Sequence, residues 1–208
     1  MPSASDNFTG ENCFIITNPS MGAFHLYGDD PDEIKIRDIA NATSKQCRFT
    51  GHMEEDSWYS VAQHMVDVSH IVEKLGGSKA DQFAALLHDA PEAYLSDIAA
   101  PFKRELAVYY EKEALIWKRI AAKFGVPEKL PTVVKDADWI ALFIEARTFV
   151  VPSNPAICEK WVGWDPWGIK AKTFPYIMKQ KTYVQAKWSY LDRFEELQDA
   201  LTPSSRRD

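Results

Sequence analysis

The chain has 208 residues, of which 46% are hydrophobic and 26% are charged, and this suits one soluble globular domain with a sizeable core. Its net charge of -6 argues against a surface for binding nucleic-acid polymers, and its apolar runs are too short to cross a bilayer. No basic and apolar leader opens the chain, and its three cysteines (Cys13, Cys47 and Cys158) form no CxxC pair, so we expect a cytoplasmic protein with free thiols.

Residues 1–33 are expected to form a short arm, irregular or short-stranded, because turn signals recur at Asn18-Pro19 and at 28–31. Asp32 is positioned to cap a helix over about 33–44.

The clearest helical pattern covers about 58–75, where apolar residues recur at spacings of three and four before Gly76-Gly77 ends it. The next helix begins after Ser78, a predicted N-cap. Pro91 lacks an N–H and should break or kink that helix close to His88-Asp89, which would open space for a ligand.

Three further helices complete the expected fold, over about 104–124, closed by Gly125, over about 132–150, capped by Thr132, and over about 174–201. The prolines and glycines of 152–168 predict a long loop, and 202–208 form a polar tail. The sum is an all-α fold, with one helical-bundle domain over 34–201 between the arm and the tail.

Four nitrogen- and oxygen-bearing side chains stand where helical periodicity predicts buried faces: His64, His88, Asp89 and Asp138. Imidazole and carboxylate ligands suit one divalent cation (Co, Mn, Zn, Mg, Fe or Ni), and such a site indicates metal-assisted hydrolysis. The alternative is a pair of hydrogen-bonded core histidines with two helix-end aspartates. A carboxylate buried without a partner costs several kcal/mol, which favours the cation.

Two more acids follow the His88-Asp89 pair. Glu92 lies one helical turn after His88, and Asp97 follows in Leu95-Ser-Asp97. Carboxylates beside a metal site can orient a water molecule or accept its proton, so both are catalytic candidates. The alternative, a solvated helix-end charge and a cap for the next turn, remains open on the residues alone.

Three cations are candidates for contacting phosphate: Arg48, Lys103 and Lys135. Each could equally be a solvated surface charge. Near Arg48, Phe49 offers an aromatic ring on which a base could stack, and Gly51 and His52 are candidate contacts to the base or sugar.

Taken in order, these motifs resemble the HD-domain metal-dependent phosphohydrolases. The residues that carry the resemblance are Arg48-Phe-Thr-Gly-His52, Tyr59-Ser-Val-Ala-Gln-His64, Leu86-Leu-His-Asp-Ala-Pro-Glu-Ala-Tyr-Leu-Ser-Asp97 and Lys135-Asp-Ala-Asp138. The most similar branch holds bacterial deoxyribonucleoside 5′-monophosphatases and phage deoxynucleotide triphosphohydrolases, in particular the dATP triphosphohydrolases of phages with 2-aminoadenine genomes. The resemblance covers about 34–150.

The resemblance implies His64, His88, Asp89 and Asp138 as ligands of the metal, Glu92 as the catalytic carboxylate and Asp97 as a second active-site acid. It also implies that Arg48, Lys103 and Lys135 bind phosphate. Phe49 departs from the tryptophan frequent at its position, and the segment between Gly51 and Tyr59 is this chain's own, so the choice of base stays open.

Residues 90–137 contain no histidine, whereas the dinuclear relatives add histidines there, so we expect a mononuclear site and a hydrolase rather than a di-iron oxygenase. The expected reaction cleaves dATP to deoxyadenosine and triphosphate. The alternatives are a deoxyribonucleoside 5′-monophosphatase and a non-catalytic nucleotide-binding or regulatory helical module. Enzymes of this resemblance are often dimers or hexamers, so we expect a homo-oligomer, located in the host cytoplasm if a phage encodes it.

Overall fold

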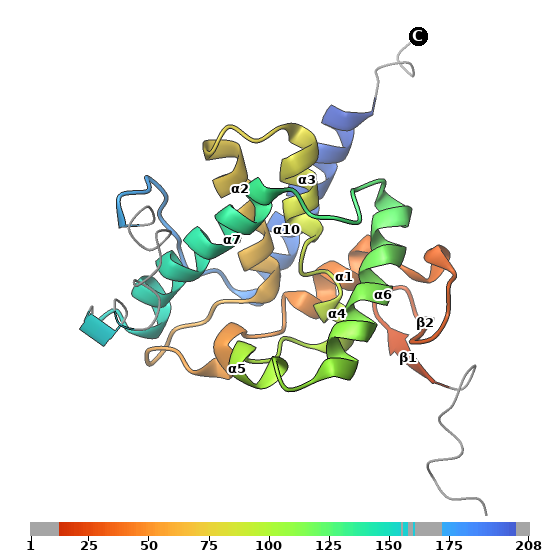
Figure 1. Ribbon diagram of the computed structural model, residues 1–208, viewed down its shortest axis with the longest axis horizontal. Coiled ribbons are helices and arrows are strands. Elements are labelled where there is room, and N and C mark those ends of the chain that lie inside the picture. The colour runs from red at the N-terminus through yellow and green to blue at the C-terminus, as the bar shows by residue number, and fades with distance from the viewer. Residues whose placement is uncertain (1–12, 155, 158–159, 161–171, 203–208) are drawn as a thin grey trace, which may run out of the picture.

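The computed structural model describes residues 13–154, 156–157, 160 and 172–202. Within them the chain is mostly helical, with a small two-stranded sheet near the N-terminus (Figure 1). The longer helices are α1 (Ile36–Thr43), α2 (Val61–Lys74), α3 (Lys79–Leu87), α6 (Ala107–Phe124), α7 (Thr132–Glu145) and α10 (Tyr183–Leu201). Single turns form α4 (Glu92–Leu95) and α5 (Ala100–Lys103).

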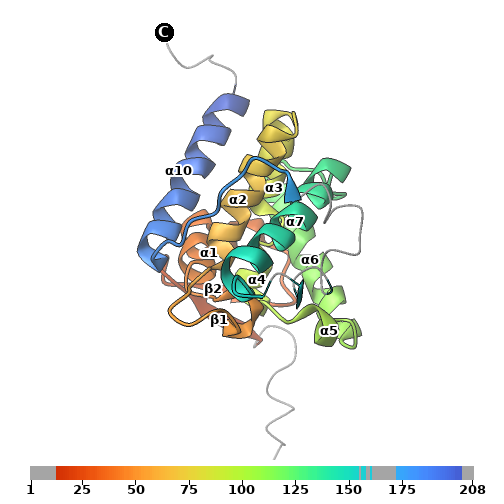
Figure 2. The ribbon, with the colours of Figure 1, turned by 90° about the vertical axis from the view of Figure 1, so that its left-hand side faces the viewer.

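Helix α2 lies at the centre of the fold and contacts α3, α7 and α10. Its sequence specifies this place, because apolar residues surround the helix rather than forming one stripe, and a helix of that kind is buried. Its first turn is capped by the Ser60 hydroxyl, which accepts a hydrogen bond from the Gln63 amide. Figure 2 shows α10 along one side of the bundle and α5 at the opposite outer edge.

Helix α3 ends where the proline predicts. Ser78 and Asp81 form a reciprocal capping box at its start, and His88 is the C-cap residue. After Asp89 the chain turns at Pro91 and begins the single turn α4 with Glu92. The break therefore places two potential ligands and a third acid within five residues of one another.

The N-terminal arm corrects the all-α prediction. Strands β1 (Phe14–Thr17) and β2 (Gly22–His25) pair antiparallel, and the 3-10 turn η3 (Pro31–Glu33) follows. Asp32 does not cap a helix, because the N-cap of α1 is Lys35 and the Asp32 carboxylate instead forms an ion pair with Lys123. Buried Arg119 of α6 anchors the arm by donating to the His25 and Asp30 carbonyls and to Glu33.

Two expected helix starts also need correction, whereas α7 and the π-helix after it together cover the helix expected over about 132–150. Gly125 terminates α6 in the left-handed conformation as predicted, but Thr132 is the first residue of α7 and not its cap, which is Pro131. Helix α7 ends at Glu145 and continues as a π-turn over Ala146–Val150. The last helix begins at Tyr183, not near 174, because Thr182 and Gln185 form a capping box that starts it there.

Two sequence predictions fall partly outside the described residues, namely the loop over 152–168 and the tail over 202–208. Cys13 and Cys47 are free thiols as expected, while Cys158 lies outside the described part. No helix of the described segments is long and apolar enough to span a bilayer.

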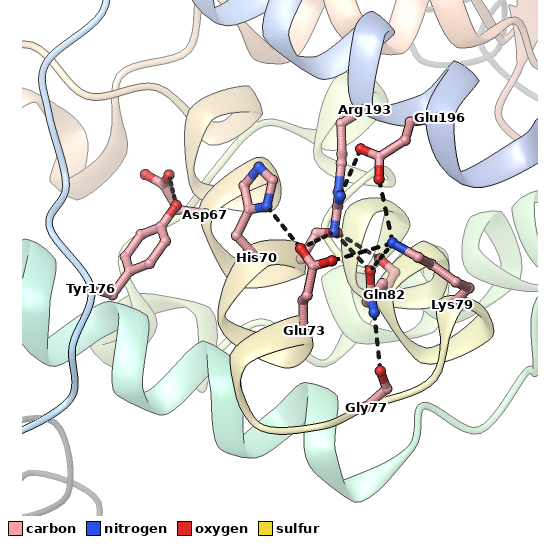
Figure 3. Close-up of polar contacts among 10 residues, drawn as sticks. Asp67, His70, Glu73, Gly77, Lys79, Gln82, Tyr176, Arg193 and Glu196 are labelled. Carbon is pink, nitrogen blue, oxygen red and sulfur yellow. Dashed lines mark hydrogen bonds and ion pairs between the residues drawn. The ribbon is translucent and has the colours of Figure 1, made fainter. Parts of the chain in front are cut away.

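A buried arginine joins α10 to the two helices beside it (Figure 3). The Arg193 side chain is 4% exposed, and its guanidinium donates to Ser69 and Glu73 of α2, to Gln82 of α3 and to Glu196 of its own helix. Lys79 adds ion pairs to Glu73 and Glu196 at the exposed side of the cluster. One guanidinium therefore satisfies polar groups on three helices at once.

Arg193→Ala is expected to lower the free energy of unfolding by about 2–4 kcal/mol, because it leaves the buried Ser69 and Gln82 groups without this donor. Urea denaturation of the purified variant measures the change. Glu196→Gln is the matched control, since half of the Glu196 side chain is exposed, and its effect should stay below about 1 kcal/mol. Equal losses in the two variants would contradict this role of Arg193.

Candidate metal centre

Three helical segments bring four potential ligands together. His64 comes from α2, His88 and Asp89 from the end of α3, and Asp138 from the middle of α7. The His64 Nε2 atom lies 3.3 Å from His88 Nε2, 3.4 Å from Asp89 Oδ2 and 3.1 Å from Asp138 Oδ1. His88 Nε2 lies 3.3 Å from Asp89 Oδ2 and 3.8 Å from Asp138 Oδ1.

These spacings fit one transition-metal ion. With bonds of about 2.1 Å, neighbouring ligands of a tetrahedral or octahedral ion lie roughly 3.0–3.4 Å apart. The donor atoms of His64, His88 and Asp138 all lie within 4.8 Å of one another, so these residues form a possible metal-binding triad, and Asp89 is in reach as a fourth ligand.

The hydrogen bonds of the two imidazoles direct their lone pairs at this centre. His88 Nδ1 lies 2.7 Å from the Ala85 carbonyl oxygen, which can only accept, so Nδ1 carries the proton. His64 Nδ1 lies 2.5 Å from Glu145 Oε1 and donates to that carboxylate. The Nε2 atoms of the neutral rings are then acceptors that face each other and two carboxylate oxygens, an arrangement that needs a cation.

The charges around the centre also favour a bound cation. The carboxylates of Asp89, Asp138 and Glu145 contact the imidazoles, and among the described residues only the guanidinium of Arg48 pairs with them, which leaves two negative charges in excess around neutral rings. Burial acts to lower the pKa of His64, but the surrounding carboxylates raise it well above its usual value. Burial would raise the pKa of Asp138, but its contacts with His64 and His88 outweigh burial and hold that pKa well below its usual value. The centre attracts positive charge, and a divalent cation would supply the missing amount.

One side of the centre is open. The side chains of His64 and His88 are 0% and 5% exposed, whereas those of Asp89 and Asp138 are 22% and 44% exposed. Structural metal sites are usually closed, while catalytic sites keep a position for water or substrate. The exposure of the two aspartates is the arrangement expected of a catalytic site.

Glu145 contacts the metal centre, although the sequence motifs indicate no role for it. It is fully buried at the end of α7 and accepts from His64 Nδ1 and, at 3.0 Å, from Arg48 Nε. Arg48 Nη1 also lies 3.7 Å from Asp89 Oδ2. Burial would raise the pKa of Glu145, but Arg48 and His64 outweigh burial, so the pKa of Glu145 lies below its usual value. An acid two helical turns after Asp138 on an apolar face was the signal in the sequence.

Of the two catalytic candidates, Glu92 begins the turn α4 and Asp97 follows directly after it. Glu92 is 4% exposed, and its Oε2 atom has no hydrogen-bond partner among the residues that the structure describes. Burial raises the pKa of Glu92 well above its usual value, and the charges of Asp89 and Asp97 add to this. Burial also raises the pKa of Asp97.

The side chain of Gln46 forms hydrogen bonds with the backbone of both acids. Its side-chain Nε2 donates to the Glu92 carbonyl at 2.9 Å, and its Oε1 accepts from the Asp97 amide at 3.2 Å. Nothing in the sequence pattern around Gln46 indicates this contact, since the two partners are 46 and 51 residues away.

The remaining candidates are two lysines and three residues at the turn η4. Lys103 ends α5 and forms an ion pair with Glu113, and Lys135 is exposed one turn before Asp138 on α7. Phe49 lies beside Arg48, whose guanidinium carbon is 5.5 Å from its ring centre. Gly51 and His52 are exposed at the end of the turn η4 (Arg48–Gly51). The roles of all five in binding phosphate, base or sugar stay predictions.

Comparison with known proteins relates the chain to two others and assigns no activity. Over 125 residues it is 45% identical to the uncharacterized protein YfdR of Escherichia coli, and the match covers 59% of this chain and 66% of that protein. Over 125 residues it is 33% identical to the uncharacterized protein RCAP_rcc00048 of Rhodobacter capsulatus, covering 59% of this chain and 64% of that protein. The match thus spans slightly less than two thirds of either relative. No family model matches the chain.

Glu145→Gln is expected to weaken metal binding by about 10- to 100-fold, because the amide keeps the shape but loses the charge that orients His64. Isothermal titration with Mn²⁺ measures the affinity. Glu73→Gln, at the far end of α2, is the control and should bind Mn²⁺ like the wild type. An unchanged affinity in Glu145→Gln would show that Glu145 does not support the metal centre.

Proposed function

We propose that this protein is a metal-dependent phosphohydrolase of 2′-deoxynucleotides. The observation that carries the proposal is the buried, unpartnered Oε2 of Glu92 next to a two-histidine, two-aspartate donor set with an open side. A buried carboxylate oxygen without a partner costs stability, so its place is better explained by a group that enters during the reaction.

The chain's own residues would divide the work as follows. A divalent metal, when bound, supplies a Lewis acid that polarises a phosphate oxygen and lowers the pKa of water. Glu92 orients the attacking water and takes up its proton on Oε2, an atom that no side chain of the described residues engages. The oxygen of that water bonds to the phosphorus carrying the 5′ oxygen, the P–O5′ bond breaks, and O5′ gains a proton. Arg48, Lys103 and Lys135 are the proposed cations for the developing charge.

The proposed substrate is dATP, which would give deoxyadenosine and triphosphate. The support for a deoxynucleotide, for adenine and for a phage relationship is the resemblance of the four sequence motifs. Phe49, Gly51 and His52 are the proposed contacts to base and sugar, since all three lie on or next to the turn that also carries Arg48.

A deoxyribonucleoside 5′-monophosphatase is the second candidate, and the position of Arg48 favours it. Arg48 is 12% exposed and already engages Glu145 and Asp89, which leaves fewer free donors for a long chain of phosphates. The non-catalytic binding module finds less support, because such a module has no use for the unpartnered Glu92 oxygen. A homo-oligomer and a cytoplasmic location remain part of the proposal.

Product analysis tests the proposal. Chromatography of Mn- or Co-loaded protein incubated with each dNTP and each dNMP should reveal deoxyadenosine plus triphosphate from dATP. Phosphate release from several monophosphates would establish the second candidate instead. Turnover of neither set by metal-loaded protein would overturn the proposed enzyme and favour the binding module.

Glu92→Gln is expected to lower kcat by about 100- to 10,000-fold, because the amide cannot take up the proton of the attacking water. Metal content measured on the same preparation should match the wild type, since Glu92 is not one of the four proposed ligands. Glu195→Gln on the exposed side of α10 is the control and should retain full activity. A Glu92→Gln rate equal to that of the wild type would remove Glu92 from the mechanism.

A further inference from the structure

Helix α5 is a single turn at the outer edge of the molecule, away from the central helices (Figures 1 and 2). Three of its four residues are exposed, including Phe102 at 62%, and none is buried. Packing in the core therefore cannot fix the position of this turn. Its fourth residue, Lys103, is the partly buried one, with 18% of its side chain exposed.

The neighbouring helix α6 holds the Lys103 ammonium group from several sides. Glu113 forms an ion pair with it at 2.6 Å, and the Tyr109 and Tyr110 ring centres lie 4.8 and 5.8 Å from Nζ. Tyr109 is itself fixed, because its hydroxyl donates to the Ser96 carbonyl at 2.7 Å, at the end of the turn that carries Glu92. Cation–π contact and a short ion pair together restrict an otherwise flexible side chain.

The Lys103 ammonium group interacts electrostatically with the carboxylates of Glu92 and Asp89. Burial lowers the pKa of Lys103, but Glu113 raises it, and the charges of Glu92 and Asp89 raise it further. Lys103 therefore stays charged, and Tyr109, which its ammonium group faces, bonds to Ser96 at the end of α4 and so ties Lys103 to the segment that carries Glu92. An ammonium group has three N–H donors, so an ion pair with Glu113 leaves others for phosphate oxygens.

We propose that Glu113 is a positioning residue that holds Lys103 at the rim of the metal centre to bind a substrate phosphate. The inference rests on the proposed phosphohydrolase function and adds to it a residue of α6 that has no role in the sequence motifs. Glu113 acts by limiting where Lys103 can go before substrate arrives, so less conformational freedom is lost on binding.

The same helix offers a matched control. Glu111 and Lys112 form an ion pair at 2.9 Å, but 64% of the Glu111 side chain is exposed, and the ammonium group of Lys112 lies over the ring of Tyr27 in the N-terminal arm. Exposed pairs of this kind contribute little. Glu111→Gln removes one carboxylate from α6 without touching Lys103.

The test compares Glu113→Gln, Glu113→Asp and Glu111→Gln in the Mn-loaded full chain. Glu113→Gln should raise KM for the hydrolysed nucleotide about tenfold, a change of about 1.4 kcal/mol, while kcat stays within about twofold. Binding of inorganic phosphate, measured by calorimetry, should weaken by a similar factor. Glu113→Asp should recover part of both losses, and Glu111→Gln should match the wild type.

A double-mutant cycle separates positioning from a general effect on the fold. If Glu113 acts through Lys103, Lys103→Ala with Glu113→Gln should bind inorganic phosphate no more weakly than Lys103→Ala alone. Additive losses, an unchanged KM in Glu113→Gln, or a lower KM would each overturn the inference. A wild-type protein that neither binds phosphate nor hydrolyses nucleotides would overturn the proposed function, and the inference with it.

Discussion

The carboxylate of Glu145 is fully buried between the guanidinium of Arg48 and the imidazole of His64. An isolated charge in such a place would cost several kcal/mol of stability. Each charged group in this series of contacts therefore needs its neighbour as a partner. Arg48 continues the chain to Asp89, and His64 continues it to Asp138. The excess of negative charge that remains at the open end is what a divalent cation would neutralise, and the chemistry proposed for the protein depends on that cation.

The other buried arginines join elements in the same manner at a distance from the metal centre. Arg119 links α6 to the N-terminal arm and lies over the Phe24 ring, and Arg193 links α10 to α2 and α3. Helix α2 thus receives Arg193 near its C-terminal end, while its N-terminal half carries His64. Contacts near both ends hold α2 in place, and Glu145 holds His64 on it, which are conditions for a preorganised site.

The sequence predicted much of this structure because its strongest signals are local. The periodicity over 58–75, Ser78 as N-cap, the break at Pro91 and Gly125 as terminator all depend on neighbouring residues, and the structure confirms them. The sequence did not predict that α10 starts at Tyr183 or that Lys35 is the N-cap of α1. Neighbours of Thr182 and Lys35 are equally plausible as N-cap residues. The structure also brings His64, His88, Asp89 and Asp138 together, as the pattern of lone polar residues on apolar faces indicated. Contacts of Glu145 and Gln46 depend on residues distant in sequence, and that of Glu113 depends on a residue of another helix, so periodicity cannot pair them.

The stoichiometry of metal binding tests the central claim most directly. Purified chain, stripped with a chelator and titrated with Mn²⁺ in a calorimeter, should bind one ion per chain, and the His64→Ala variant should bind none at the same concentrations. One ion would match four acceptor atoms around two excess negative charges. Two ions per chain would contradict a mononuclear centre. No binding by the wild type would contradict the claim that the buried carboxylates here bind a metal ion.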